Sequence, residues 1–113
     1  MDFILHHYES SPVSELVRIA LGIKGASWKS VLIPNMGAKP ELAPLTGGYR
    51  KTPVLQIGAD IYCDSAAIID AIEAHAPEPT LFPAPLGALA RVIAGWAGGP
   101  MFGACAVTAL APV

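Results

Sequence analysis

Two adjacent serines, Ser10 and Ser11, stand where an apolar segment changes to a helical pattern, and Pro12 follows them. With Pro12 as first helical residue, Ser11 takes the N-cap position and its oxygen accepts a backbone N–H bond. The position also suits chemistry, because a helix N-terminus carries about half a positive charge and free N–H donors. A serine hydroxyl there could donate to a thiolate and lower the pKa of the bound thiol. Spacing does not separate these two roles, and both can hold.

A second candidate is the segment "RKTPVLQI", in which Pro53 opens a predicted strand after a turn-rich loop. A cis bond before Pro53 would turn the Thr52 N–H and C=O outward, where they could pair with a peptide-like ligand. The alternative is an ordinary proline at the first position of a strand. The pattern alone leaves both interpretations open.

A third candidate is "CDSAAI", which places Asp64 and Ser65 before a helical pattern. Either residue can cap that helix. Alternatively, the free N–H groups and the Ser65 hydroxyl could hold a carboxylate while Asp64 receives an ammonium, as the amino-acid end of a ligand requires. The histidines form no recognisable triad, and Cys63 and Cys105 lack metal-ligand spacing, so we expect no metal.

The elements that must position these segments follow from periodicity and turn residues. A helix is predicted after Ser11, and residues 38–45 contain two prolines and support at most a short helix. Two strands, a hairpin and a second clear helix are predicted over residues 2–8, 27–33, 53–63 and 64–76. The strand–helix–strand start implies a parallel pair, and the hairpin adds antiparallel strands. We therefore expect an α/β fold in which helices pack on a four-stranded mixed sheet.

The proline-rich segment 77–85 is the best domain boundary, which predicts a first domain over residues 1–76. Residues 86–113 begin with a helical pattern, and no charge occurs from Val92 to Val113. That uncharged length could span a bilayer. Its glycines, prolines and alanines favour instead the buried start of a second, all-helical domain that is truncated in this chain, and we expect no membrane contact.

Composition narrows the class of protein. The chain is 53% hydrophobic and only 14% charged, which predicts a surface that meets a partner subunit or a missing part of the protein. The net charge of −2 argues against nucleic-acid binding. Two cysteines suit buried thiols in a reducing compartment, and polar residues near the start interrupt any signal-peptide core. A cytoplasmic location is the default expectation.

The order of "SSPVSELVRIALGIKG", "KPE", "TPV" and "DS" resembles the glutathione transferase superfamily in its thioredoxin-like N-terminal domain, of βαβαββα order. The resemblance covers Asp2 to about Phe82 and continues weakly beyond. Ser11 stands where omega-class enzymes place a cysteine, and a serine there is similar to the theta and zeta classes. "RIALGIKG" also resembles the zeta class.

This resemblance implies glutathione as co-substrate and a role for each motif. Lys39 would contact the glycyl end of glutathione, and Thr52 with a cis Pro53 would pair with the cysteinyl backbone. Asp64 and Ser65 would grip the γ-glutamyl end. Ser11, or else Ser10, would hydrogen-bond the thiolate, although tyrosine-type classes keep their catalytic residue near the position of Tyr8.

The implied function is a glutathione transferase that activates the thiolate for attack on a small electrophile, as in detoxification, or for a zeta-type isomerisation. The superfamily also implies a homodimer, and a helical domain that forms the electrophile pocket. The alternative is a non-catalytic module of the same fold that binds glutathione or a protein. A thiol-disulfide oxidoreductase is disfavoured, because no cysteine stands at the helix start.

Overall fold

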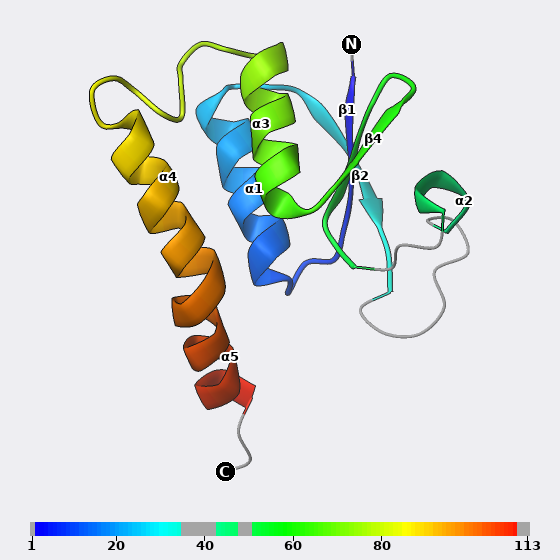
Figure 1. Cartoon of the computed structure of the whole chain (residues 1–113). Coiled ribbons are helices and arrows are strands. Elements are labelled where there is room, and N and C mark those ends of the chain that lie inside the picture. The colour runs from blue at the N-terminus through cyan, green and yellow to red at the C-terminus, as the bar shows by residue number, and fades with distance from the viewer. Residues whose placement is uncertain (1, 35–42, 48–50, 111–113) are drawn as a thin grey trace. The chain divides into compact units, whose positions relative to one another are not determined.

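The computed structural model describes residues 2–34, 43–47 and 51–110 (Figure 1). The elements are, in chain order, β1 (Phe3–His7), α1 (Pro12–Ile23), β2 (Trp28–Leu32), α2 (Ala43–Thr46), β3 (Val54–Ile57), β4 (Asp60–Cys63), α3 (Ser65–His75), α4 (Gly87–Trp96), η1 (Ala97–Met101) and α5 (Phe102–Leu110). The first seven confirm the βαβαββα order expected from the sequence, and α2 is a single turn, as its prolines predicted.

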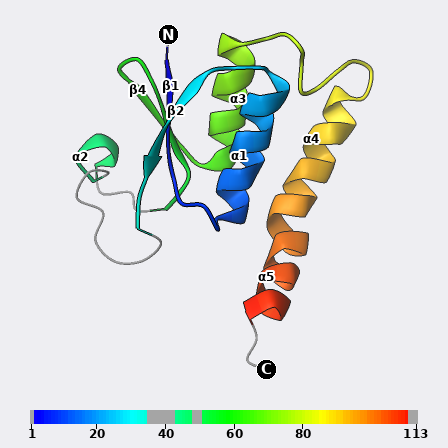
Figure 2. The same cartoon turned by 180° about the vertical axis from the view of Figure 1, so that it is seen from behind.

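The four strands form one mixed sheet in the order β2-β1-β3-β4. β1 runs parallel to β2 and antiparallel to β3, and β3 and β4 form the predicted hairpin. Helices α1 and α3 lie side by side on one face of the sheet, and α2 lies on the other side in both views (Figures 1 and 2). This is the thioredoxin-like arrangement that the sequence predicted.

Helix α1 has clear start and stop signals. The Ser11 side chain accepts a hydrogen bond from the Ser14 N–H, and Pro12 occupies the first turn, where its missing N–H is not needed. At the other end Gly25 adopts φ +64°, and the amides of Gly25 and Ala26 donate to the carbonyls of Gly22 and Leu21. These two bonds make a Schellman motif, which turns the chain back toward β2.

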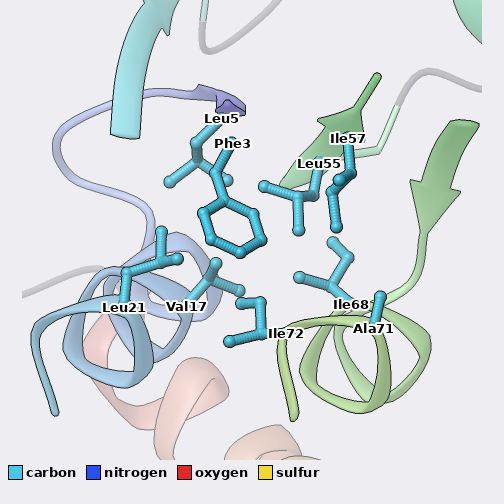
Figure 3. Close-up of a cluster of buried hydrophobic side chains, with 9 residues drawn as sticks. All are labelled: Phe3, Leu5, Val17, Leu21, Leu55, Ile57, Ile68, Ala71 and Ile72. Carbon is cyan, nitrogen blue, oxygen red and sulfur yellow. The ribbon is translucent and has the colours of Figure 1, made fainter. Parts of the chain in front are cut away.

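The main core lies between the sheet and the helix pair (Figure 3). It is built from side chains of β1, β3, α1 and α3, namely Phe3, Leu5, Val17, Leu21, Leu55, Ile57, Ile68, Ala71 and Ile72. Burial of each large aliphatic side chain stabilises the fold by roughly 1.5–3 kcal/mol. The core therefore fixes both helices against the sheet, and with them the residues at their N-termini.

The apolar faces of the two helices are only partly covered. In α1, Val17 and Leu21 are completely buried, whereas Leu16 and Ile23 are about half exposed. In α3, Ile68 and Ile72 reach the core, whereas Ile69 is only half-buried. Periodicity thus predicted both helices correctly, and this domain buries only one face of each.

The chain divides into two compact units, Met1–Thr80 and Leu81–Val113. In the second unit the Arg91 guanidinium lies 3.9 Å from the centre of the Phe82 ring, a cation–π contact beside the start of α4. Pro100 lies in the π-helical turn η1 between α4 and α5. The stretch Gly87–Ala109 is long and apolar enough to cross a membrane by length and composition, and none of its most apolar part is buried.

Candidate functional site

Strand register brings three of the predicted segments to one end of the sheet. Val54 pairs with His6 on one side and with Cys63 on the other. The segment before Val54 and the segment after Cys63 are therefore neighbours, and the end of β1, which leads into α1, lies beside them. Both α1 and α3 begin at this end, the lower end of the sheet in Figure 1. Two helix N-termini thus lie at the same edge as a strand start.

Ser11 is the N-cap residue of α1. Its Oγ accepts from the Ser14 N–H at 3.1 Å, and the residue is 97% buried, with 3% of its surface exposed. A hydroxyl that accepts one bond still has a proton to donate. No acceptor for that proton is found within residues 2–34, 43–47 and 51–110. The cap predicted from "SP" is confirmed, and it leaves the donor capacity of Ser11 unused.

Ser10 and Tyr8 flank this cap and differ from it in exposure. Ser10 is exposed, and Tyr8 is half-buried. The Ser11 amide donates to the Tyr8 carbonyl at 3.2 Å, which closes the turn between β1 and α1. Of the three hydroxyl residues, Ser11 is therefore the one whose side chain is held in place by a hydrogen bond to the helix.

Thr52 and Pro53 lead into β3. The Thr52–Pro53 peptide bond is cis, as expected, and so are the Glu78–Pro79 and Ala84–Pro85 bonds. Pro53 is buried and Thr52 is half-buried. Pro53 precedes Val54, the first paired residue of β3, so its missing N–H removes no hydrogen bond from the sheet.

Asp64 and Ser65 join β4 to α3. Asp64 takes the N-cap position, but its side chain makes no capping hydrogen bond, in contrast to the prediction from the sequence. Its φ of 74° lies in a region that residues with a side chain rarely adopt, and such backbone strain is typical of ligand-binding positions. The carboxylate of Asp64 is exposed and the Ser65 side chain is half-buried. The first N–H groups of α3 are thus not capped by Asp64.

Lys39, the fifth glutathione contact implied by the resemblance, lies outside the described residues. In the part of the chain that the structure describes, no group of three or more His, Cys, Asp or Glu side chains could hold a metal ion.

An arginine that was not predicted from the sequence lies beside this loop. The Arg18 guanidinium donates to the carbonyls of Tyr8, Glu9 and Ser11 at 3.4, 3.1 and 3.4 Å. It also forms an ion pair with Glu15 at 2.8 Å. The spacing in the sequence could have indicated this contact. Arg18 follows Ser11 by seven residues, or two helical turns, so both residues lie on the same face of α1.

His7 links this arginine to the sheet. Its Nδ1 lies 2.7 Å from Arg18 Nη1, and its Nε2 lies 2.6 Å from the Ser30 hydroxyl. A guanidinium only donates, so Nδ1 must be the acceptor and the proton must reside on Nε2. Burial, and next the Arg18 charge, lower the pKa of His7. His7 is thus a neutral, buried link, where the sequence had indicated no role.

The two cysteines differ in their surroundings. Cys63 is half-buried at the end of β4, and burial raises the pKa of its thiol, which keeps it protonated near neutral pH. Cys105 is exposed on α5, so the expectation that both thiols are buried is wrong for that residue.

Comparison with protein families identifies the class. Residues 5–80 match the family described as glutathione S-transferase, N-terminal domain. The chain therefore belongs to the glutathione S-transferase superfamily through its N-terminal domain, as the motifs indicated. No match is found among curated protein sequences.

Solved structures agree with this assignment. A glutathione S-transferase-like protein from Pseudomonas syringae is 44% identical, with a TM-score of 0.90, over 98% of this chain and 40% of that one. A bacterial maleylpyruvate isomerase, described as a zeta-class glutathione S-transferase, is 30% identical, with a TM-score of 0.69, over 83% of this chain and 45% of that one. The rice protein GST1, solved in complex with glutathione, is 24% identical, with a TM-score of 0.71, over 84% of this chain and 44% of that one. The chain thus spans less than half of the length of each of these relatives.

Proposed function

We propose that this chain binds glutathione and that the whole protein uses it as a thiol nucleophile. The observation that carries the proposal is the convergence of Ser11, Thr52–Pro53 and Asp64–Ser65 at one end of the sheet. Membership of the glutathione S-transferase N-terminal family supports it. So does the maleylpyruvate isomerase, a zeta-class glutathione S-transferase to which the chain is 30% identical.

The γ-glutamyl end of the ligand would lie at the start of α3. Its carboxylate would accept from the free N–H groups of the first turn and from the Ser65 hydroxyl. Its ammonium would pair with the Asp64 carboxylate, which is exposed and is not used as a helix cap. A zwitterionic end needs both partners, and this short segment offers both.

The cysteinyl residue would lie along Thr52, whose N–H and C=O would pair with its backbone in an antiparallel manner. The sulfur would then reach the N-terminus of α1. There the Ser11 hydroxyl, already accepting from Ser14, would donate its remaining proton to the thiolate. That bond and the helix dipole both favour the charged form, so the thiol pKa falls and the nucleophile is present near neutral pH.

In the whole protein the thiolate would attack an electrophilic carbon. A C–S bond forms, and the leaving group departs with the bonding electron pair. In the isomerase variant the thiolate adds to one carbon of a cis double bond, which thereby becomes a single bond. Rotation about that single bond, followed by expulsion of the thiolate, re-forms the double bond in the trans geometry. The serine at the start of α1 and the similarity to maleylpyruvate isomerase favour testing both reactions.

Calorimetric titration of the chain with glutathione tests binding, and conjugation of a chloronitrobenzene and isomerisation of maleylpyruvate test turnover. Saturable binding together with either activity supports an enzyme. Binding without turnover would support the alternative, a glutathione-binding module. A folded chain that binds no glutathione would contradict the proposal.

The half-exposed leucine and isoleucines of α1 (Leu16, Ile19 and Ile23) favour a partner surface. We propose that the whole protein is a homodimer in the cytoplasm, in which further helical structure covers such faces. Light scattering of the purified protein measures the mass, and a monomer at all concentrations would contradict this part of the proposal.

A further inference from the structure

Arg18 makes an unusual number of contacts for a helix-surface residue. Its side chain is only 15% exposed, and the guanidinium accounts for six hydrogen-bond contacts. Three of these go to backbone carbonyls of the loop that joins β1 to α1, and one goes to a strand residue, His7. A helix needs none of these contacts in order to form, so they indicate that the loop has to be held.

The loop contacts act on Tyr8 and Glu9, which precede the cap residue, and on Ser11 itself. Arg18 Nη1 binds the Tyr8 carbonyl, which also accepts from the Ser11 amide. Arg18 Nη2 binds the carbonyls of Glu9 and Ser11. The backbone of Ser11 is thus held at its N–H side through Tyr8 and at its carbonyl directly. With the backbone held, the Oγ remains within hydrogen-bond distance of the Ser14 amide.

The guanidinium is itself held by two side chains, one on α1 and one on β1. Glu15, one turn away on α1, accepts from Nε and Nη2 at 3.1 and 2.8 Å. His7 Nδ1 accepts from Nη1, and the Ser30 hydroxyl fixes the other side of the His7 ring. A fork of five donors matches this set of acceptors, and a lysine ammonium would reach only part of it.

We propose that Arg18 is a positioning residue, which fixes the β1–α1 loop so that the Ser11 hydroxyl faces the glutathione sulfur, an inference that rests on the proposed function. Arg18 acts through Ser11 and the loop carbonyls and does not contact the substrate. A consequence is that the loss of the guanidinium weakens the donor bond to the thiolate even where the domain remains folded.

The experiment compares wild type, Arg18→Met and Arg18→Lys by amide hydrogen exchange and by the pH dependence of the glutathione thiolate absorbance. In the ligand-free chain we expect the Ser14 amide to exchange about tenfold faster in Arg18→Met, since it loses its fixed acceptor. The Ile72 amide, in the middle of α3, should not change. With glutathione bound, we expect the thiol pKa to rise by roughly half a unit in Arg18→Met. Arg18→Lys should restore less than half of both effects.

Lys29→Met is the matched control, because Lys29 forms an exposed ion pair with Asp2 away from the loop. Lys29→Met should change neither the exchange rate of the Ser14 amide nor the pKa of the bound thiol. Unchanged Ser14 exchange in Arg18→Met would overturn the proposal, whether or not glutathione binds. An unchanged thiol pKa in an Arg18→Met chain that still binds glutathione would also overturn it. Failure of the wild type to bind glutathione would contradict the proposed function instead, and the exchange measurement would still decide the role of Arg18.

Discussion

The Ser14 amide donates to Ser11 Oγ at 3.1 Å, and this bond both begins helix α1 and fixes the hydroxyl at the helix N-terminus. A capping serine with an unused proton can stabilise an anion without a neighbouring base. The capping role of Ser11 uses the hydroxyl oxygen, and the proposed role toward the thiolate would use the hydroxyl proton. They can be separated by the choice of replacement.

Ser11→Ala and Ser11→Gly should differ in the free energy of unfolding but have the same effect on the pKa of the bound glutathione thiol. Alanine at an N-cap costs about 1 kcal/mol of the free energy of unfolding, whereas glycine costs only a few tenths. Both remove the hydroxyl, so both should raise the pKa of bound glutathione. Urea denaturation and thiolate absorbance measure the two quantities. Ser10→Ala is the control, and a larger effect of Ser10→Ala on the thiol pKa would assign the role to Ser10.

The buried ion pair between Lys24 and Glu73 should contribute strongly to stability. The Lys24 side chain is completely buried, contacts Glu73 and also donates to the Pro79 carbonyl at 2.5 Å. Lys24→Met leaves the mostly buried Glu73 carboxylate without this cation, and we expect a loss of about 3 kcal/mol. Urea denaturation measures it.

The double variant Lys24→Met/Glu73→Leu should recover most of that loss, because an apolar pair avoids the buried charge. Lys29→Met, which breaks an exposed ion pair with Asp2, should change stability very little. Equal losses of stability from Lys24→Met and Lys29→Met would contradict the prediction that the buried ion pair contributes more than the exposed one.

His7 should make the fold less stable in mild acid. Its folded pKa is lowered below the ordinary value of 6.5 by burial and by Arg18. Between the folded value and about 6.5 the unfolded chain binds the proton and the folded chain does not, so stability is lost as the pH falls through this window. Above it the His7 contribution does not vary with pH.

Denaturation curves across this range measure the slope of stability against pH. The His7→Gln variant should lose part of that slope, whereas His75→Gln, on the exposed end of α3, should keep it. The same slope of stability against pH in wild type and His7→Gln would contradict the prediction that His7 causes the loss of stability in mild acid. The titrating and charged neighbours of His7 are Arg18, Glu9 and His6.

Core packing should depend on Ile72 far more than on Ile23. Ile72 is completely buried between α3 and the sheet, whereas Ile23 is 53% exposed on α1. Ile72→Ala should cost about 2–5 kcal/mol of the free energy of unfolding. Thermal denaturation of both variants checks this, and a comparable loss from Ile23→Ala would show that the outer face of α1 is covered in solution.

Features set by neighbouring residues could be predicted from the sequence. Ser11 and Pro12 start a helix, Gly58 turns a hairpin, and alternation in residues 53–63 gives two paired strands, because each of these is a local preference. The order of these elements then implied the mixed sheet. Motif order also identified the family correctly.

Features that depend on contacts distant in the chain could not be predicted. Periodicity in α1 shows that Leu16 and Val17 are both apolar, but not which of them faces the sheet. Asp64 was expected to cap α3, yet its backbone at φ 74° leaves the side chain outside the cap. The link from His7 to Arg18 joins a strand to a helix across 11 positions, and spacing within one element gives no direct sign of it.

We propose that glutathione binds across Ser11, Thr52 and Asp64–Ser65, and amide chemical-shift mapping of the isotope-labelled chain is the direct test of this binding site. Titration with glutathione should shift the amides of these residues in a saturable manner and leave the Gly58 amide, in the turn at the other end of the β3–β4 hairpin, unchanged. S-methylglutathione should reproduce the shifts at Thr52 and Ser65 and reduce the shift at Ser11, because it has no thiolate. Absence of saturable shifts at these residues in the folded chain, or shifts centred elsewhere, would contradict the account.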